Sequence, residues 1–131
     1  MHKVFVYGTL KQGLSNHSHF LGDAELIGEA ETVDKFGMMD LGAFPAMVKT
    51  VKHGVVLGEV YEVDDSQLAR VDMLEGHPSF YEREEIDVFL VKDDVAPMTS
   101  CWAYFLPDDK RKDLMKANEK GELSWPCATE S

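Results

Sequence analysis

A glutamate near the end of a predicted helix is the residue in this sequence best suited to proton transfer. Asp64 or Asp65 can begin the helix as its N-cap, and Gly76 can end it in the left-handed conformation. On a wheel of about 100° per residue, Glu75 falls inside the apolar arc of the helix. That arc consists of Leu68, Val71 and Leu74. The pattern therefore places a carboxyl group where a core residue is expected.

Two effects would raise the pKa of a carboxyl group in that place, namely the loss of water and the negative end of the helix dipole. A carboxyl lifted from about 4.3 toward neutrality can both take and give a proton at pH 7. The alternative is that the helix frays before Glu75, which then pairs with Arg70 or Arg83 on the surface. Tyr81 and Arg83 could reach back toward Glu75, although Tyr81 could equally begin the next strand. The helical pattern leaves both interpretations open.

The second candidate is the segment that follows the first apolar run, 4–7. This run is β-branched or aromatic and predicts a buried strand, which stops at Gly8. A strand that ends at glycine before a short loop can point several backbone N–H groups the same way and so hold a carboxylate or phosphate. The alternative is an ordinary exit from a strand into a loop.

Histidines and cysteines offer weaker signals. His17 and His19 have metal-ligand spacing, but no nearby side chain completes a ligand set, so a role in positioning their loop is favoured over metal binding. Cys101 and Cys127 are too few for a disulfide framework, and we expect reduced thiols. Cys101 lies in an apolar run typical of a strand and is expected in the core.

The chain is acidic, because 13 Lys and Arg against 24 Asp and Glu give a net charge of −11. Nucleic acid is therefore not an expected partner, since a phosphate backbone requires a basic face. Long-range attraction adds little for an anionic substrate, so short-range donors must hold its carboxylate. The apolar runs are too short to span a membrane and the N-terminus lacks a signal-peptide pattern. We expect a cytoplasmic protein with no membrane partner.

The remaining pattern predicts many short strands and little helix. The predicted strands are 4–7, 24–33, 36–39, 46–51, 55–63, 86–91 and 100–106. Gly58, inside one of them, indicates a bulge or close backbone packing. We expect one domain over 1–131 with a closed or nearly closed β-sheet and helices packed on it. Its charged segment 107–131 would be a short helix around Leu114 or a loose tail, and Trp125 suggests that the end docks back on the domain.

Two blocks of the sequence are similar to one protein family. The first block is Val4-Phe5-Val6-Tyr7-Gly8-Thr9-Leu10-Lys11-Gln12-Gly13, followed by Asn16-His17. The second block is Gly58-Glu59-Val60-Tyr61-Glu62-Val63, followed by Leu68, Asp72, Leu74-Glu75-Gly76, Pro78, Tyr81 and Arg83. In this order, over about 4–104, they resemble the γ-glutamyl cyclotransferase-like family, and within it most closely the γ-glutamylamine branch.

The resemblance implies an α+β fold, a small mixed β-barrel flanked by short helices. It also implies conversion of a small-molecule γ-glutamyl compound to 5-oxoproline and a free amine, without a metal or organic cofactor, by a monomer or homodimer. Carried over by residue, Glu75 is the catalytic acid/base. The predicted substrate-binding residues are Tyr7, Gly8, Thr9 and Leu10, largely through backbone groups, together with Tyr81.

The resemblance leaves the leaving group open among an alkylamine, the ε-amine of lysine and a biosynthetic intermediate, with glutathione ranked lower. A binding module that uses the same site without turnover is an alternative, because folds can outlive their activity. A hydrolase with a nucleophilic side chain has little support, since no Gly-x-Ser-x-Gly motif occurs and neither cysteine adjoins a histidine.

Overall fold

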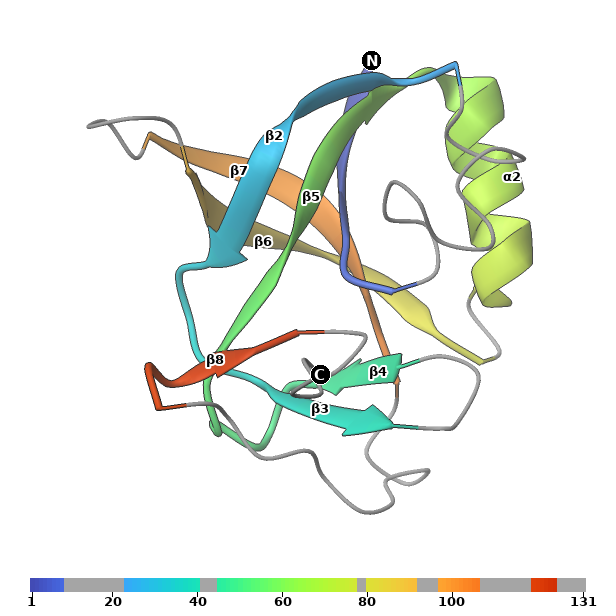
Figure 1. Cartoon of the computed structure of the whole chain (residues 1–131). Coiled ribbons are helices and arrows are strands. Elements are labelled where there is room, and N and C mark those ends of the chain that lie inside the picture. Colours follow the sequence, from blue (N-terminus) through green and yellow to red (C-terminus); the bar gives the residue numbers. More distant parts are fainter. Residues whose placement is uncertain (9–22, 41–44, 78–79, 92–96, 107–118, 125–131) are drawn as a thin grey trace, which may run out of the picture.

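The computed structural model describes residues 1–8, 23–40, 45–77, 80–91, 97–106 and 119–124. Within these ranges it contains one helix and a mixed sheet (Figure 1). The elements in chain order are β1 (His2–Val6), β2 (Glu25–Thr32), β3 (Gly37–Asp40), β4 (Pro45–Val48), β5 (Val55–Val63), α2 (Asp65–Glu75), β6 (Glu82–Leu90), β7 (Met98–Phe105) and β8 (Glu122–Leu123).

The sheet returns on itself as a ring of five strands. Its order is β1-β5-β2-β6-β7, and β1 pairs with β7 a second time. That closing pair is parallel and aligns Val4 with Trp102, whereas the other four pairings in the ring are antiparallel. The β3–β4 hairpin extends the sheet, since β4 lies parallel to β7. The prediction of a small α+β fold with a mixed sheet is confirmed.

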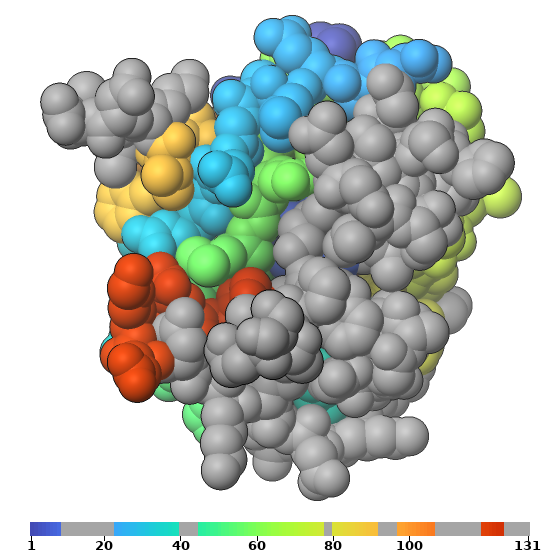
Figure 2. All heavy atoms as spheres, in the orientation of Figure 1, coloured from blue at the N-terminus to red at the C-terminus, as the bar shows by residue number. Residues whose placement is uncertain are grey.

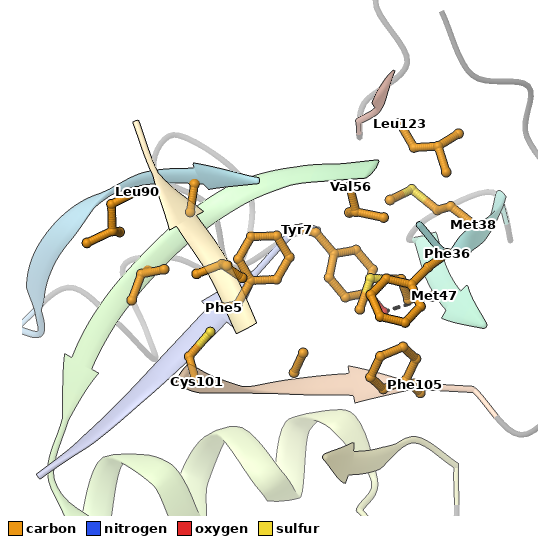
Figure 3. Packing of buried hydrophobic residues seen from close by; sticks show 14 residues of the cluster. Phe5, Tyr7, Phe36, Met38, Met47, Val56, Leu90, Cys101, Phe105 and Leu123 are labelled. Carbon is orange, nitrogen blue, oxygen red and sulfur yellow. Dashed lines mark hydrogen bonds between the residues drawn. The ribbon is translucent and has the colours of Figure 1, made fainter. Parts of the chain in front are cut away.

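Both faces of β1 and β7 are buried toward the ends of these strands, over 4–6 and 103–105, which explains the apolar sequence there. Along β1, Phe5 points into the ring, while Val4 and Val6 point to the opposite face, toward α2. The inner cluster, shown in Figure 3, contains side chains from all five ring strands. Its members are Phe5, Tyr7, Ala30, Phe36, Met38, Met47, Val56, Val60, Val88, Leu90, Cys101, Ala103, Phe105 and Leu123. Cys101 is thus a core residue, as predicted.

The single described helix covers the outer face of β1 and β5. Leu68 and Val71 are its buried residues, and they belong to the same cluster as Val4, Val6 and Val63. In Figure 1 the helix accordingly lies outside the ring, beside β1 and β5. Across the described ranges, no helix combines the length and apolar content that crossing a bilayer requires.

The end of the chain contributes a strand that the sequence analysis did not predict. β8 pairs in parallel with the start of β5, and Leu123 is buried in the inner cluster. Figure 2 shows β8 on the surface next to β5. The chain therefore does return to the domain, but through 122–123. The predictions for Trp125, Cys127 and a helix near Leu114 lie outside the described residues.

Predicted and observed strands agree in number before β8 but differ at their ends. β6 begins at Glu82 rather than 86, and β7 begins at Met98 rather than 100. The prediction started both strands too late because their first residues are exposed or partly buried and form no apolar run. β4 ends at Val48, three residues earlier than predicted.

Gly58 resolves in favour of close packing rather than a bulge. A Cβ at this position would lie 2.4 Å from the Val6 carbonyl oxygen and 2.7 Å from the ring of Phe5. The register shift in this part of the sheet lies in β2 instead, between Leu26 and Gly28. The missing side chain of Gly58 therefore lets β5 approach β1 where the chain leads toward Gly8.

We predict that Gly58→Ala lowers the free energy of unfolding by about 1–3 kcal/mol, because the new methyl group must displace backbone and a packed ring. Urea denaturation followed by circular dichroism would measure the change. Met73→Ala, at an exposed position of α2, is the control and should change the free energy by less than about 0.5 kcal/mol. An unchanged midpoint for Gly58→Ala would contradict the close approach.

Candidate active site

The capping of α2 fixes the position of Glu75. At the first turn, the Asp64 side chain accepts from the Gln67 backbone N–H at 2.7 Å, and the Gln67 side chain accepts from the Asp64 N–H at 2.8 Å, which forms a capping box. At the other end, Gly76 adopts φ 68° and ψ 33°, a left-handed cap. Glu75 is thus the last helical residue, and the helix does not fray before it.

The carboxyl group of Glu75 is partly buried and its pKa is raised to about 7. Loss of water is the larger cause, and the negative charge of Asp72 one turn earlier adds to it. Within the described ranges no hydrogen bond or ion pair to this carboxyl group is found. Of the two interpretations left open, the structure favours the perturbed carboxyl group. Burial is the cause that the sequence analysis named, and the neighbouring carboxylate is one that it did not identify.

Three tyrosine hydroxyls from different elements lie close enough to Glu75 to feel its charge. Burial raises the pKa of Tyr7, Tyr81 and Tyr104, and the Glu75 carboxylate raises each of them further. Tyr7 follows β1, Tyr81 precedes β6 and Tyr104 lies in β7. All three stay protonated at neutral pH, so they surround Glu75 with neutral phenols rather than charges.

The protons of these hydroxyls are used within the protein. Tyr7 donates to the carbonyl oxygen of Tyr104 at 2.7 Å and accepts from the Met47 N–H at 2.9 Å, the contact dashed in Figure 3. Tyr81 donates to the carbonyl oxygen of Pro45 at 2.6 Å. The two side chains therefore fasten β4 beside Glu75. Tyr81 does not begin the next strand, which starts at Glu82. Its backbone N–H instead donates to the Glu75 carbonyl oxygen at 3.3 Å.

Gly8 lies against the same hairpin. A Cβ on Gly8 would lie 2.9 Å from Cδ of Pro45, so the absence of a side chain permits contact between the end of the first strand and β4. The predicted backbone cradle extends over Thr9 and Leu10, which lie outside the described residues, as do His17 and His19. Among the residues that the structure describes, no three His, Cys, Asp or Glu side chains are grouped to hold a metal ion.

Arg83 does not pair with Glu75, which was one of the predicted alternatives. Its guanidinium donates instead to both carboxylate oxygens of Asp72, from Nε at 2.9 Å and from a terminal nitrogen at 3.2 Å. Asp72 also accepts from the Tyr104 hydroxyl. The strand register explains this arrangement, because Arg83 and Tyr104 lie directly opposite each other in β6 and β7.

Sequence reasoning missed the roles of Asp72 and Tyr104. Asp72 carried a usable signal, since residues three apart share a helix face and it precedes Glu75 by three. Tyr104 carried a weaker one, as a polar-tipped side chain in a buried strand. The hydrogen bonds that join Tyr7 and Tyr81 to β4 had no sequence signal, because they depend on how the hairpin docks.

Comparison with known proteins shows the family of the chain. The sequence model of a family described as "Gamma-glutamyl cyclotransferase, AIG2-like" matches residues 4–125. A protein of Methanocaldococcus jannaschii, named provisionally as a gamma-glutamylcyclotransferase, is 39% identical over 108 residues, covering 82% of this chain and 87% of its own. The Escherichia coli K12 gamma-glutamylcyclotransferase family protein YtfP is 32% identical over 120 residues, covering 92% and 94%.

A solved structure supports the same placement. The crystal structure of an AIG2-like protein of Mus musculus superposes with a TM-score of 0.75 at 27% sequence identity, and the match covers 99% of each chain. At this coverage the fold is shared over its whole length.

The raised pKa of Glu75 predicts a pH dependence of stability. Its folded pKa of about 7 exceeds the ordinary 4.5, so the folded state binds the proton more tightly than the unfolded state does. The resulting stabilisation is complete below pH 4.5 and is lost as pH rises to about 7. The glutamine side chain in Glu75→Gln cannot ionise, so the variant does not lose stability for this reason as pH rises. We therefore expect the variant to gain stability relative to wild type between these values, and to show a constant difference above them.

Urea denaturation of both proteins in steps from pH 4 to pH 8.5 measures this difference, and taking the difference removes the titration of the other carboxylates. Glu82→Gln, at an exposed position at the start of β6, is the matched control and should show no such trend. A difference between wild type and Glu75→Gln that is independent of pH would contradict the burial of Glu75.

Proposed function

The chain belongs to the γ-glutamyl cyclotransferase, AIG2-like family, and on that premise we propose that it converts a γ-glutamyl amine or amide to 5-oxoproline and a free amine, with Glu75 as acid and base. The observation that carries the proposal is the state of Glu75. It is a partly buried carboxyl group with a pKa of about 7, at a fixed helix end among three neutral phenols.

The reaction requires one proton to move twice. The α-amine of the substrate attacks the γ-carbonyl carbon, a C–N bond forms, and a five-membered ring closes. The attacking nitrogen must lose a proton to have a free electron pair, and its pKa is roughly 8. When the tetrahedral intermediate collapses, the bond to the leaving nitrogen breaks and that nitrogen must gain a proton. A carboxyl group with a pKa of about 7 can accept the first proton and deliver the second.

Ring closure within one molecule needs little further catalysis once the chain is held folded, because the reacting atoms are already joined. The proposed grip on the γ-glutamyl part comes from the backbone of Tyr7, Gly8, Thr9 and Leu10. Tyr81 adds an aromatic wall. The hydroxyl protons of Tyr7 and Tyr81 are given to backbone carbonyls, so these side chains shape the site rather than donate to the substrate. No step requires a metal or organic cofactor.

The first test of the proposal is the release of 5-oxoproline from a panel of γ-glutamyl compounds. The panel holds γ-glutamyl alkylamines, ε-(γ-glutamyl)lysine and glutathione. The control is a series of α-glutamyl amides, in which attack of the α-amine on the amide carbonyl would have to close a three-membered ring. We expect release from at least one γ-glutamyl amine and none from the α-glutamyl series. Tight binding of γ-glutamyl compounds without any release would favour the binding-module alternative.

The second test is Glu75→Gln, which we expect to lower kcat/KM at least about a hundredfold while the protein stays folded, because the amide cannot exchange protons at neutral pH. Glu82→Gln serves again as the matched control and should retain wild-type rates, since it lies exposed at the start of β6. Retained turnover in Glu75→Gln would remove Glu75 from the assigned role.

The third test is the pH profile of kcat/KM. Glu75 must be ionised to accept the proton from the substrate, so we expect the rate to rise with pH through an inflection near 7. A basic limb should follow near the pKa of the substrate amine, roughly 8. An acid limb centred near 4.5, the ordinary glutamate value, would show that another group or an unperturbed Glu75 is at work.

A further inference from the structure

Asp72 and Glu75 lie on the same face of α2, three residues apart, but their surroundings differ. Glu75 has no described partner, whereas Asp72 accepts two hydrogen bonds from Arg83 and one from the Tyr104 hydroxyl. The side chains of Arg83 and Asp72 are 20% and 19% exposed, so the pair is largely shielded from water. An arginine fork on a carboxylate in such a place is directional as well as strong.

Arg83 is also held by groups other than Asp72. Its backbone N–H donates to Nδ1 of His77 at 3.1 Å, just beyond the helix end. Its guanidinium carbon lies 4.4 Å from the ring centroid of Trp102, a stacking geometry that suits a planar cation. The strand, the histidine and the indole together direct the guanidinium to Asp72. Arg83, which the sequence spacing puts within reach of Glu75, is therefore paired with Asp72 instead.

A cation paired with Glu75 would work against proton exchange. An opposite charge within about 4–6 Å typically lowers a carboxyl pKa by about 1–3. The carboxyl group then stays ionised near neutrality, where it is a weak base and a poor proton donor. In the structure, the groups that face Glu75 either raise its pKa or carry no charge. Asp72 is a negative charge that raises the pKa of Glu75, and Tyr7, Tyr81 and Tyr104 are neutral. His77, whose ring nitrogen accepts from Arg83, is the nearest histidine in sequence.

We propose that Asp72 is a positioning residue for the reaction, which holds Arg83 in a bidentate pair and so keeps the Glu75 carboxyl group unpaired and free to exchange protons. The inference rests on the proposed function of Glu75, and it adds a residue that acts through that group without touching the substrate. It also assigns Arg83 to the support of the site rather than to the substrate carboxylate.

The electrostatic part is tested without substrate, by following the carboxyl carbon of Glu75 by NMR through a pH titration. Asp72→Asn keeps the shape of the side chain but releases Arg83, so the pKa of Glu75 should fall by at least about 1. Arg83→Gln leaves Asp72 uncompensated, so the pKa should rise. The double variant has neither charge and should lie between Asp72→Asn and wild type.

The order expected is therefore Arg83→Gln highest, then wild type, the double variant and Asp72→Asn. Asp65→Asn, at an exposed position in the first turn of the same helix, is the matched control and should leave the pKa of Glu75 unchanged. If Arg83→Gln does not fold, the order of the other three proteins carries the test. An unchanged pKa in Asp72→Asn, or equal values in Asp72→Asn and the double variant, would overturn the proposal.

The kinetic part uses the same variants and the release of 5-oxoproline at pH 7. We expect Asp72→Asn to lose about tenfold or more in kcat with little change in KM, a fraction of the 10²–10⁴ that an acid/base group supplies. Removing Arg83 as well should restore part of the lost rate, which a merely structural role of Asp72 does not predict. A raised KM for Arg83→Gln with no change in the pKa of Glu75 would instead make Arg83 a substrate-binding residue and overturn the proposal.

The two layers of the experiment fail separately. If wild type releases no 5-oxoproline from any γ-glutamyl compound, the proposed function is wrong, while the NMR titration still reports whether Asp72 and Arg83 control the charge of Glu75. If wild type is active and the pKa order is absent, the proposed function stands and the role of Asp72 is wrong.

Discussion

The buried hydroxyl of Tyr7 is the point at which the sheet, the hairpin and the site meet. A hydroxyl removed from water must satisfy its hydrogen-bonding capacity within the protein. That of Tyr7 does so by donating to the backbone of β7 and accepting from the backbone of β4. The Tyr7 side chain therefore bridges the backbones of β4 and β7, and it holds the hairpin against the ring. Tyr104 continues the link, because its carbonyl receives Tyr7 while its hydroxyl reaches Asp72 on α2.

Through this link the strands and the helix end share one electrostatic environment. The chain carries a net charge of −11, yet in the described part of the site a single positive side chain, Arg83, is paired with a single carboxylate, Asp72. The pair leaves Glu75 beside a negative charge in a setting with little water, and both conditions raise its pKa. A carboxyl group with a pKa near neutrality thus follows from burial and from a neighbouring carboxylate on the same helix, and not from any exotic residue.

Local sequence patterns predicted the elements well where burial has a simple period. β5 was predicted at its observed ends, 55–63. The helix was predicted with Gly76 at its end and with Asp64 as one of two N-cap candidates, because capping chemistry is local. The prediction for β6 began too late because the sequence of residues 82–85, Glu-Arg-Glu-Glu, is typical of a polar loop. They form a strand because they pair with the last four residues of β7, 102–105. β8 was missed because two residues carry no periodic signal, and its formation depends on pairing with the start of β5.

The sequence by itself determined a helix with a glycine end, whose apolar arc includes Glu75 if the helix reaches it, and a buried strand that stops at Gly8. These are consequences of helix and strand periods and of the backbone freedom of glycine, which act within a few residues. Only the tertiary structure decided whether Arg83 pairs with Glu75 or with Asp72, and which hydroxyls surround the carboxyl group. Those outcomes depend on the register of β6 against β7 and on the docking of β4. Both bring together residues tens of positions apart, and no period in the chain encodes such distances.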